Sequence, residues 1–364
     1  MSVEAAVDDG NGQRPAGRPI LEVENLRTTF YTRRETVRAV DGVSFDVYPG
    51  ETVGLVGESG AGKSVTARSL MGLVDAPGRI EAGSSIRFNG RELTNLTEQA
   101  WRQVRGGAIA MVFQDPLSSL NPVYTIGNQI REALRLHQGL EGSAAREEAI
   151  SLLEAVGIPD ASRRIREYPH QFSGGMRQRA VIAMALACDP EVLIADEPTT
   201  ALDVTIQAQI LDLLQEIQAD RDLAIIFITH DMGVIAEICD RVHVMYAGEI
   251  VETAQVEAMF DDPKHPYTQG LLESIPGRHP DADRLLTIEG EVPTPTEAPT
   301  YCRFAPRCSK AFEACDTVHP VLVPVTDDAT DHEAACLLYP EDDIREDAID
   351  RHRRAAAASE DTDE

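Results

Sequence analysis

Lysine is almost missing from this sequence of 364 residues: it occurs only at Lys63, Lys264 and Lys310. Lysine and arginine together number 33, against 61 aspartates and glutamates, so the formal net charge is −28. A surface this acidic repels the phosphates of nucleic acids, which argues against a DNA- or RNA-binding protein. We interpret the charge as a halophilic adaptation to high salt; a dedicated cationic partner is the alternative.

Long apolar runs are also missing. The longest uncharged apolar run, Ala180–Cys188, has about half the length that a helix needs to span a bilayer. The N-terminal residues are polar and acidic, unlike a secretory signal peptide. We therefore expect a cytosolic chain that works at a membrane only by docking onto an embedded partner.

Aromatic residues make up only 5% of the chain, whereas hydrophobic residues in total reach 43%. The core must therefore be mainly aliphatic, and wholesale disorder is excluded. The length suits one large domain and a smaller one. Six cysteines in a cytosolic chain favour metal binding or free thiols over disulfides.

The hydrophobic pattern predicts an α/β fold. Short apolar or alternating runs typical of strands occur at 21–30, 43–47, 51–56, 192–195 and 224–229, and a helix is expected over 63–73. Most of the segment 97–188 has a helical pattern. Strands that alternate with helices in this way indicate a mainly parallel sheet that is covered on both faces.

The chain changes character after about residue 251, where proline becomes dense and four of the six cysteines fall between Cys302 and Cys336. We expect a large domain over 20–255 and a separate small, cysteine-rich domain over 256–340. Residues 1–19 and 341–364 are polar or highly charged and are expected to be disordered tails.

A phosphate-binding loop follows the predicted strand 51–56. The sequence Gly-Glu-Ser-Gly-Ala-Gly-Lys-Ser at 57–64 matches the pattern G-x-x-x-x-G-K-[ST] and opens a predicted helix. Its backbone N–H groups and the helix N-terminus favour phosphate oxygens, Lys63 is expected to reach the β- and γ-phosphates, and Ser64 to ligate Mg²⁺. The predicted nucleotide-binding residues of this loop are Gly57, Glu58, Ser59, Gly60, Ala61, Gly62, Lys63, Ser64 and Val65.

A second element of the same site ends in two carboxylates. The apolar run 192–195 is followed directly by Asp196 and Glu197. Asp196, at the end of a strand, is placed to hold magnesium, and Glu197 to polarise the attacking water as the general base.

Two further motifs decide the family. The sequence Phe-Ser-Gly-Gly-Met at 172–176 precedes an arginine-containing helical run, and Thr-His-Asp at 229–231 follows an apolar strand. In this order and spacing, the four motifs resemble the ABC ATPase family. The resemblance implies a P-loop NTPase core with a RecA-like sheet and a helical subdomain at about 97–188. The family signature usually reads Leu-Ser-Gly-Gly-Gln, so Phe172 and Met176 depart from it, while the central Ser-Gly-Gly is intact.

The resemblance also assigns roles to single residues. Gln114 resembles the Q-loop glutamine, which senses Mg²⁺ and relays closure to a membrane subunit, and Ala201-Leu-Asp203 resembles the D-loop. His230 would hold the γ-phosphate and the water in line. Catalytic roles thus fall on Glu197, His230 and Gln114, and Mg²⁺ on Ser64, Gln114 and Asp196.

The resemblance further implies that two such subunits sandwich two ATP molecules head to tail. The phosphate loop of one subunit would face Ser173, Gly174 and Gly175 of the other, where the signature helix presents its N-terminus to the γ-phosphate. An aromatic residue ahead of the phosphate loop normally stacks on adenine; we expect Tyr31 in this role, with Phe30 as the alternative.

Longer motifs resemble the peptide-importer branch of the family. They lie at 113–122, 171–179, 263–268 and 290–293, and the resemblance spans about 21–336. It implies an ATPase subunit of a dipeptide or oligopeptide importer, peripheral on the cytoplasmic face of the cell membrane. The implied partners are two permeases, a second homologous ATPase and an extracellular solute-binding protein.

Other functions remain as alternatives. The same branch handles nickel and some sugars. A soluble ABC ATPase that acts on nucleic acid or ribosomes is disfavoured by the acidic charge and the single ATPase core, and an exporter ATPase by the proline- and cysteine-rich C-terminal region.

Four cysteines with the spacing C-x5-C-x6-C-x20-C form a candidate metal site: Cys302, Cys308, Cys315 and Cys336. Buried free thiols, disulfides, a structural zinc and a [4Fe–4S] cluster all compete, and tetrahedral Cys₄ zinc sites usually contain a tighter cysteine pair than any here. The resemblance favours the cluster, because ATPases of this branch can carry one on cysteines in this pattern. Nothing in the motifs links the cysteines to the ATP phosphates.

Overall fold

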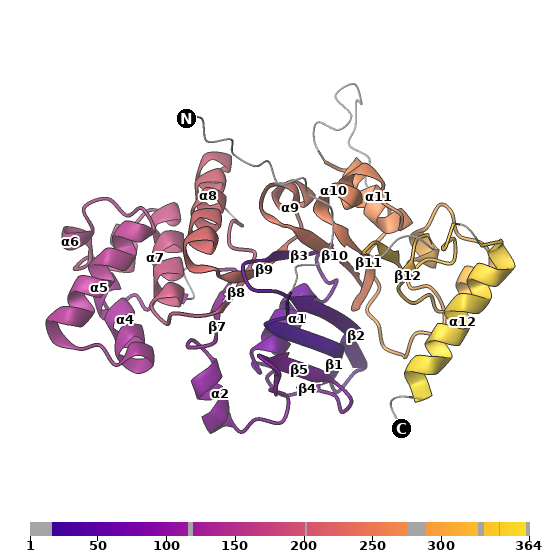
Figure 1. The fold of residues 1–364 in the computed structure, drawn as a ribbon, viewed down its shortest axis with the longest axis horizontal. Helices are drawn as coiled ribbons and strands as arrows, with labels where there is room; N and C mark the ends of the chain where they lie inside the picture. The colour runs from indigo at the N-terminus through magenta and orange to yellow at the C-terminus, as the bar shows by residue number, and fades with distance from the viewer. Residues whose placement is uncertain are drawn as a thin grey trace, which may run out of the picture.

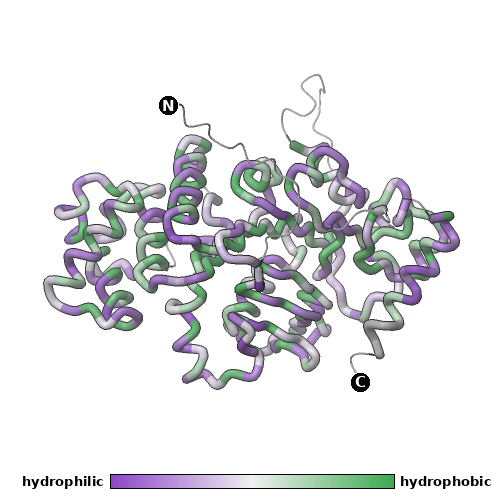
Figure 2. The backbone as a smooth tube through the Cα atoms, viewed as in Figure 1, coloured by the Kyte–Doolittle hydropathy of each residue, from purple (hydrophilic) through white to green (hydrophobic). Residues whose placement is uncertain are grey.

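The computed structural model describes residues 17–115, 119–200, 202–275, 288–326, 331–341 and 343–361. Two sheets occupy the centre of an elongated molecule, with a helical lobe at one end and the C-terminal helix at the other (Figure 1). The hydrophobic stretches lie along the central strands, while the C-terminal helix is largely hydrophilic (Figure 2). No helix within the described ranges is both long enough and apolar enough to cross a bilayer.

The larger sheet confirms the predicted α/β core. Its strands are β3 (Thr52–Val56), β7 (Ile109–Val112), β8 (Val192–Asp196), β9 (Ala224–Thr229), β10 (Arg241–Tyr246), β11 (Glu249–Gln255), β12 (Val323–Pro324) and β13 (Glu333–Ala334). They run in the order β12-β13-β11-β10-β3-β9-β8-β7. The segment from β10 to β7 is parallel, whereas β11, β12 and β13 pair antiparallel at one edge.

The smaller sheet is antiparallel and shares a core with the helix that follows the phosphate loop. It contains β1 (Leu21–Tyr31), β2 (Thr36–Val47), β4 (Gly78–Ile80), β5 (Ser85–Phe88) and β6 (Arg91–Glu92). Its order is β2-β1-β5-β6, and β4 also pairs with β1. The sequence predicted β1 and part of β2, but not the three short strands that complete the sheet.

Helices cover both faces of the parallel strands. They are α1 (Lys63–Leu70), α8 (Val204–Arg221) and α9 (Met232–Ile238). Alternate residues of one strand enter different cores: Leu193 packs with the helical lobe and α8, while Ile194 packs with α1 and the smaller sheet. This two-sided burial explains why the strands read as continuous apolar runs.

Of the segment 97–188, which was predicted to be helical, the part after β7 forms the helical lobe. The elements of the lobe are α4 (Ile126–Ala133), the π-helix η1 (Leu134–Gln138), α5 (Gly142–Ala155), α6 (Ala161–Arg164), the short η2 (Pro169–Gln171) and α7 (Gly174–Leu186). The helix α2 (Glu98–Val104) lies outside the lobe and packs in one core with α1 and the smaller sheet. The strand β7 lies inside this segment but belongs to the larger sheet. A four-residue apolar run cannot be told from a buried piece of helix by its periodicity.

The C-terminal region is not the separate domain that the sequence predicted. It contains α10 (Val256–Asp261), α11 (Pro266–Glu273), η3 (Ala305–Arg307), η4 (Glu313–Asp316) and α12 (Arg345–Asp361). Its strand β13 pairs with β11 of the larger sheet, and Tyr267 and Phe304 share one hydrophobic core with Val56 and Tyr246. The dense prolines suggested a domain boundary, although the core continues across it.

The prediction of a disordered C-terminal tail was wrong. Residues 345–361 form the helix α12, which docks through His352, whose side chain is fully buried. The His352 ring accepts a hydrogen bond from the Val321 N–H (3.2 Å) and lies 3.0 Å from the carbonyl oxygen of Cys336. Residues 1–16 and 362–364 of the two predicted tails lie outside the described part of the chain.

Candidate active site

The predicted catalytic residues meet at the carboxyl ends of the parallel strands. The phosphate loop follows β3, Gln114 follows β7, Asp196 ends β8 with Glu197 next to it, and His230 follows β9. This edge is where parallel α/β sheets bind ligands, because side chains from adjacent strands converge there. Segments that lie far apart in the sequence thus form one site.

The phosphate loop has a backbone that requires glycine at two positions. A methyl group at Gly57 would collide with the carbonyl oxygen of Met245, and one at Gly62 with that of Ala39. Gly62 also has φ of 108° and forms the N-cap of α1. The loop is therefore held close to β10 and β2, and α1 begins at Lys63 with its N-terminus facing the loop.

Lys63 and Ser64 occupy the start of α1. The Lys63 ammonium donates to the carbonyl oxygens of Gly57 (2.7 Å) and Glu58 (3.1 Å), and burial lowers its pKa although nearby carboxylates raise it. The Ser64 hydroxyl donates to the Asp196 carboxylate at 3.0 Å. This hydroxyl and carboxylate are the hard oxygen ligands that Mg²⁺ prefers alongside substrate phosphates.

Glu197 lies at the centre of the predicted catalytic set. Its carboxylate accepts hydrogen bonds from Gln114 (2.9 Å) and Thr200 (2.8 Å), and the His230 ring lies 3.3 Å from its other oxygen. Glu197 also adopts φ of +48°, a left-handed conformation that is uncommon for residues other than glycine. The side chain is thus fixed by its neighbours in an unusual turn.

Electrostatics separate the two carboxylates. Burial raises the pKa of Asp196, assisted by the adjacent Glu197 charge and opposed by the Ser64 hydrogen bond. Burial also raises the pKa of Glu197, but hydrogen bonds from Thr200 and His230 outweigh it, so the net pKa lies below the ordinary value. Glu197 is therefore ionised at neutral pH, as a base that orients water must be.

The signature residues lie in a different lobe from the phosphate loop. Ser173 is the N-cap of α7 and its hydroxyl accepts a hydrogen bond from the Met176 N–H at 3.3 Å. A methyl group at Gly175 would approach Ile206 to 2.6 Å. Figure 1 places α7 in the helical lobe, away from α1. Of the two residues that depart from the family signature, Phe172 is buried in the core that the lobe shares with α8, and Met176 packs against that core.

The predicted D-loop and adenine contacts are only partly described. Asp203 is the N-cap of α8 and accepts from the Ile206 N–H at 3.0 Å, whereas Ala201 lies outside the described residues, as do residues 116–118 of the Q-loop motif. Tyr31 ends β1, is 45% exposed, and has the Arg79 guanidinium 4.5 Å from its ring centroid. One ring face is thus covered by arginine, and adenine stacking stays a prediction.

Sequence reasoning missed three residues near this site. Thr200 supplies a hydrogen bond to Glu197, and Tyr267 and Arg307 of the C-terminal region both contact Glu58 of the phosphate loop. Arg307, which directly precedes Cys308, thus joins the cysteine region to the phosphate loop, while the absence of a cysteine role in ATP chemistry stays a prediction. The available signal was the motif 263–268, which contains Tyr267.

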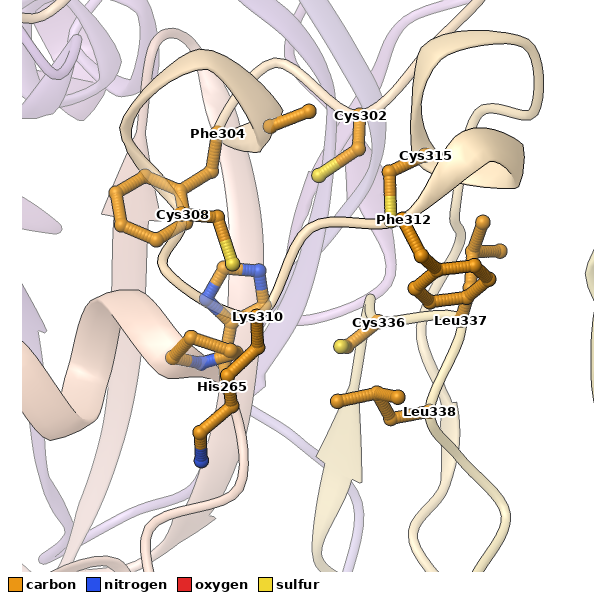
Figure 3. A pocket seen from close by; sticks show the side chains of 12 residues that line it. His265, Cys302, Phe304, Cys308, Lys310, Phe312, Cys315, Cys336, Leu337 and Leu338 are labelled. Atoms are coloured by element: carbon orange, nitrogen blue, oxygen red, sulfur yellow. The ribbon is translucent and has the colours of Figure 1, made fainter. Parts of the chain in front are cut away.

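The four predicted cysteines surround one small cavity. Cys302, Cys308, Cys315 and Cys336 line it together with His265 and Lys310 (Figure 3). All four are free thiols, and burial raises the pKa of Cys302 and of Cys336 to about 12. Within the described residues, no three His, Cys, Asp or Glu side chains gather closely enough to hold a single metal ion.

This fold and this site define an ATP-binding cassette of the ABC type, an ATPase. A family model described as ABC transporter matches residues 40–200, and one described as oligopeptide/dipeptide transporter, C-terminal region, matches residues 251–315. With relatives of 50% identity and more along most of its length, the chain belongs to the ATP-binding proteins of the ABC transporter family.

Two relatives and two solved structures illustrate the similarity. A Brucella abortus protein named for peptide import ATP binding is 54% identical over 304 residues, which cover 84% of this chain and 91% of its own. The oligopeptide transport ATP-binding protein AppD of Bacillus subtilis is 50% identical over 323 residues, 89% and 98% of the two chains. The dimeric ATP-binding cassette MJ0796, bound to ADP and Pi, has a TM-score of 0.58 at 26% identity and covers 65% of this chain and 98% of its own. The protein cbiO1 of Clostridium perfringens, part of the transporter complex cbiONQ, has the same TM-score at 27% identity. The match covers 67% of this chain and 91% of cbiO1.

Proposed function

We propose that this chain is the ATP-hydrolysing subunit of an importer of dipeptides or oligopeptides. The observation that carries the ATPase part is the convergence of Lys63, Ser64, Asp196, Glu197 and His230 at one sheet edge. The match of residues 251–315 to the oligopeptide/dipeptide transporter region supports the solute, as do the names of the relatives.

The ATP chemistry is assigned to the residues as follows. When ATP binds, Lys63 would exchange its hydrogen bonds to the Gly57 and Glu58 carbonyls for contacts with the β- and γ-phosphates, and Ser64, Asp196 and Gln114 would hold Mg²⁺. The metal ion, when bound, offsets the charge of the transferred phosphoryl group. Ionised Glu197 orients the attacking water, and His230 lies beside it to contact the γ-phosphate.

Two copies of the cassette complete each ATP site in this proposal. Ser173 caps the start of α7, and Figure 1 draws α7 in the helical lobe, away from α1, so in this proposal a second, homologous ATPase supplies the signature residues Ser173 to Gly175. The side chain of Val204, next to Asp203, is 82% exposed, as expected for a segment that a partner covers. The remaining partners are two permeases and an extracellular solute-binding protein, which place this subunit on the cytoplasmic face of the membrane.

We also assign a [4Fe–4S] cluster to the four-cysteine cavity. The donor set fits, because such clusters are held by four cysteine thiolates. Among the described residues no group of three such side chains is placed to hold a metal ion, so the assignment rests on the four-cysteine donor set. The cluster would fasten the C-terminal region and is not assigned a role in ATP hydrolysis.

The proposed solute is tested in the assembled transporter. The complex of this chain, its partner ATPase, the permeases and the binding protein is reconstituted in vesicles, and ATPase activity is measured with a di- and oligopeptide panel or with Ni²⁺. We expect peptides to stimulate the ATPase activity of the wild-type complex and not that of the Glu197→Gln complex. Stimulation by Ni²⁺ alone would replace the peptide assignment with a nickel importer, and no stimulation by either solute would refute the assignment.

A further inference from the structure

The loop between Cys302 and Cys308 is inserted into the ATP-binding cassette. Arg303 donates to the carbonyl oxygen of Ala247 at 2.7 Å and pairs with Asp41 of β2. Phe304, which is buried, packs edge-on against the Tyr246 ring with centroids 5.2 Å apart. The short segment that carries two of the four cysteines is therefore in direct contact with β2 and β10.

The last residue of this loop holds the phosphate-binding loop itself. Both terminal nitrogens of Arg307 donate to the Glu58 carboxylate, at 2.7 and 3.0 Å. The Arg307 side chain is only 6% exposed, and it is fixed by the backbone carbonyls of Glu289 (2.9 Å) and Gly290 (3.2 Å). A bidentate arginine–carboxylate pair of this kind fixes orientation as well as charge.

A second side chain of the C-terminal region holds the same residue by its backbone. The hydroxyl of Tyr267, which is fully buried in α11, accepts a hydrogen bond from the Glu58 N–H at 2.8 Å. The Glu58 carbonyl accepts from the Lys63 ammonium. Tyr267, from the motif 263–268, and Arg307, which the Gly290 carbonyl of the motif 290–293 helps to fix, thus both contact Glu58 of the phosphate loop.

We propose that Tyr267 and Arg307 are positioning residues for ATP: they fix Glu58, and Arg307 offsets its charge, so that the phosphate loop is ordered before the nucleotide arrives. Glu58 without its partner would present a carboxylate, 30% exposed, at the entrance to a site for a highly charged anion. Repulsion between like charges near a protein surface is strong enough to weaken binding. Ordering the loop in advance also lowers the entropic cost of binding.

The test measures ATP affinity and turnover separately in the full-length chain and its assembled complex. Arg307→Gln should raise the dissociation constant for ATP about tenfold or more, since a charge-assisted hydrogen-bonded pair is lost. The kcat at saturating ATP should fall less than about threefold, because Arg307 touches no reacting atom. Arg353→Gln is the matched control: it removes the same charge from α12, where Arg353 forms an ion pair with Asp350 of its own helix.

Further variants distinguish positioning from general loss of folding. Arg307→Lys should restore part of the affinity, and Glu58→Gln combined with Arg307→Gln should lose less affinity than the sum of the two single changes. Tyr267→Phe removes only a hydroxyl and decides the question if Arg307→Gln does not fold; it should also weaken ATP binding. Unchanged affinity in Arg307→Gln, an equal loss in Arg353→Gln, or strictly additive losses would overturn the proposal. The titration compares each variant with the wild-type chain for ATP binding alone, so its result does not depend on which solute the transporter carries.

Discussion

Replacing Glu197 with glutamine removes the general base of the site but leaves the fold of the site nearly unchanged. The amide has the shape of the carboxylate: its oxygen can keep the hydrogen bonds from Gln114 and Thr200, now 2.9 and 2.8 Å, and its NH2 group can donate to the His230 ring nitrogen that faces the other oxygen. We therefore expect a change in unfolding free energy below about 1 kcal/mol. Loss of the general base should lower kcat by about 10²–10⁴-fold, or about 3–5 kcal/mol in activation free energy.

Two measurements separate these effects. ATP affinity, measured by calorimetry, should be retained or improved in Glu197→Gln, because a negative charge next to the γ-phosphate is removed. Turnover is measured in the assembled transporter, and the variant should accumulate as an ATP-bound closed dimer. Glu191→Gln is the control, since Glu191 lies at the opposite end of β8, where it accepts from Asn89. Turnover of Glu197→Gln near the wild-type value would refute the assignment.

Three further predictions follow from the site and the composition. Lys63→Ala should weaken ATP binding as well as turnover, because its ammonium offsets phosphate charge in both the bound state and the transition state; calorimetry that finds unchanged affinity would contradict this. Protein purified without oxygen should contain about four irons per chain, and Cys308→Ser should lose them while Cys188→Ser, outside the cavity, keeps them; colourless protein with one zinc would assign the site to zinc. With a net charge of −28, the melting temperature should fall as KCl is lowered from molar concentration, since screening of self-repulsion is lost, and a melting temperature that does not depend on salt would remove the halophilic interpretation.

The parts of the fold that the sequence predicted are those with strong local signals. The strands β3, β8 and β9 are buried on both faces and therefore appear as apolar runs, and the phosphate loop has a glycine pattern that its backbone requires. The carboxylates at the end of β8 and the histidine after β9 could be placed in one site because parallel strands end at a common edge.

The parts that it did not predict depend on tertiary contacts. The strands β4 to β6 have two to four residues each and are defined only by pairing in the smaller sheet. The helix α12 has a charged, alanine-rich sequence, and its order depends on the contacts of His352 with the backbone of Val321 and Tyr339. The bond between Arg307 and Glu58 joins residues 249 positions apart, and no local pattern indicates which carboxylate a given arginine will meet.

The most direct test of the account is ATP-driven uptake of a labelled peptide into vesicles that contain the complete transporter. The binding protein and the labelled peptide are placed outside the vesicles, and ATP is placed inside, on the side of this subunit. The wild-type complex should then accumulate the peptide inside the vesicles. The complex with Glu197→Gln should bind ATP and accumulate none. Uptake that continues without ATP, or that is unaffected by Glu197→Gln, would contradict the claim that this site powers peptide import.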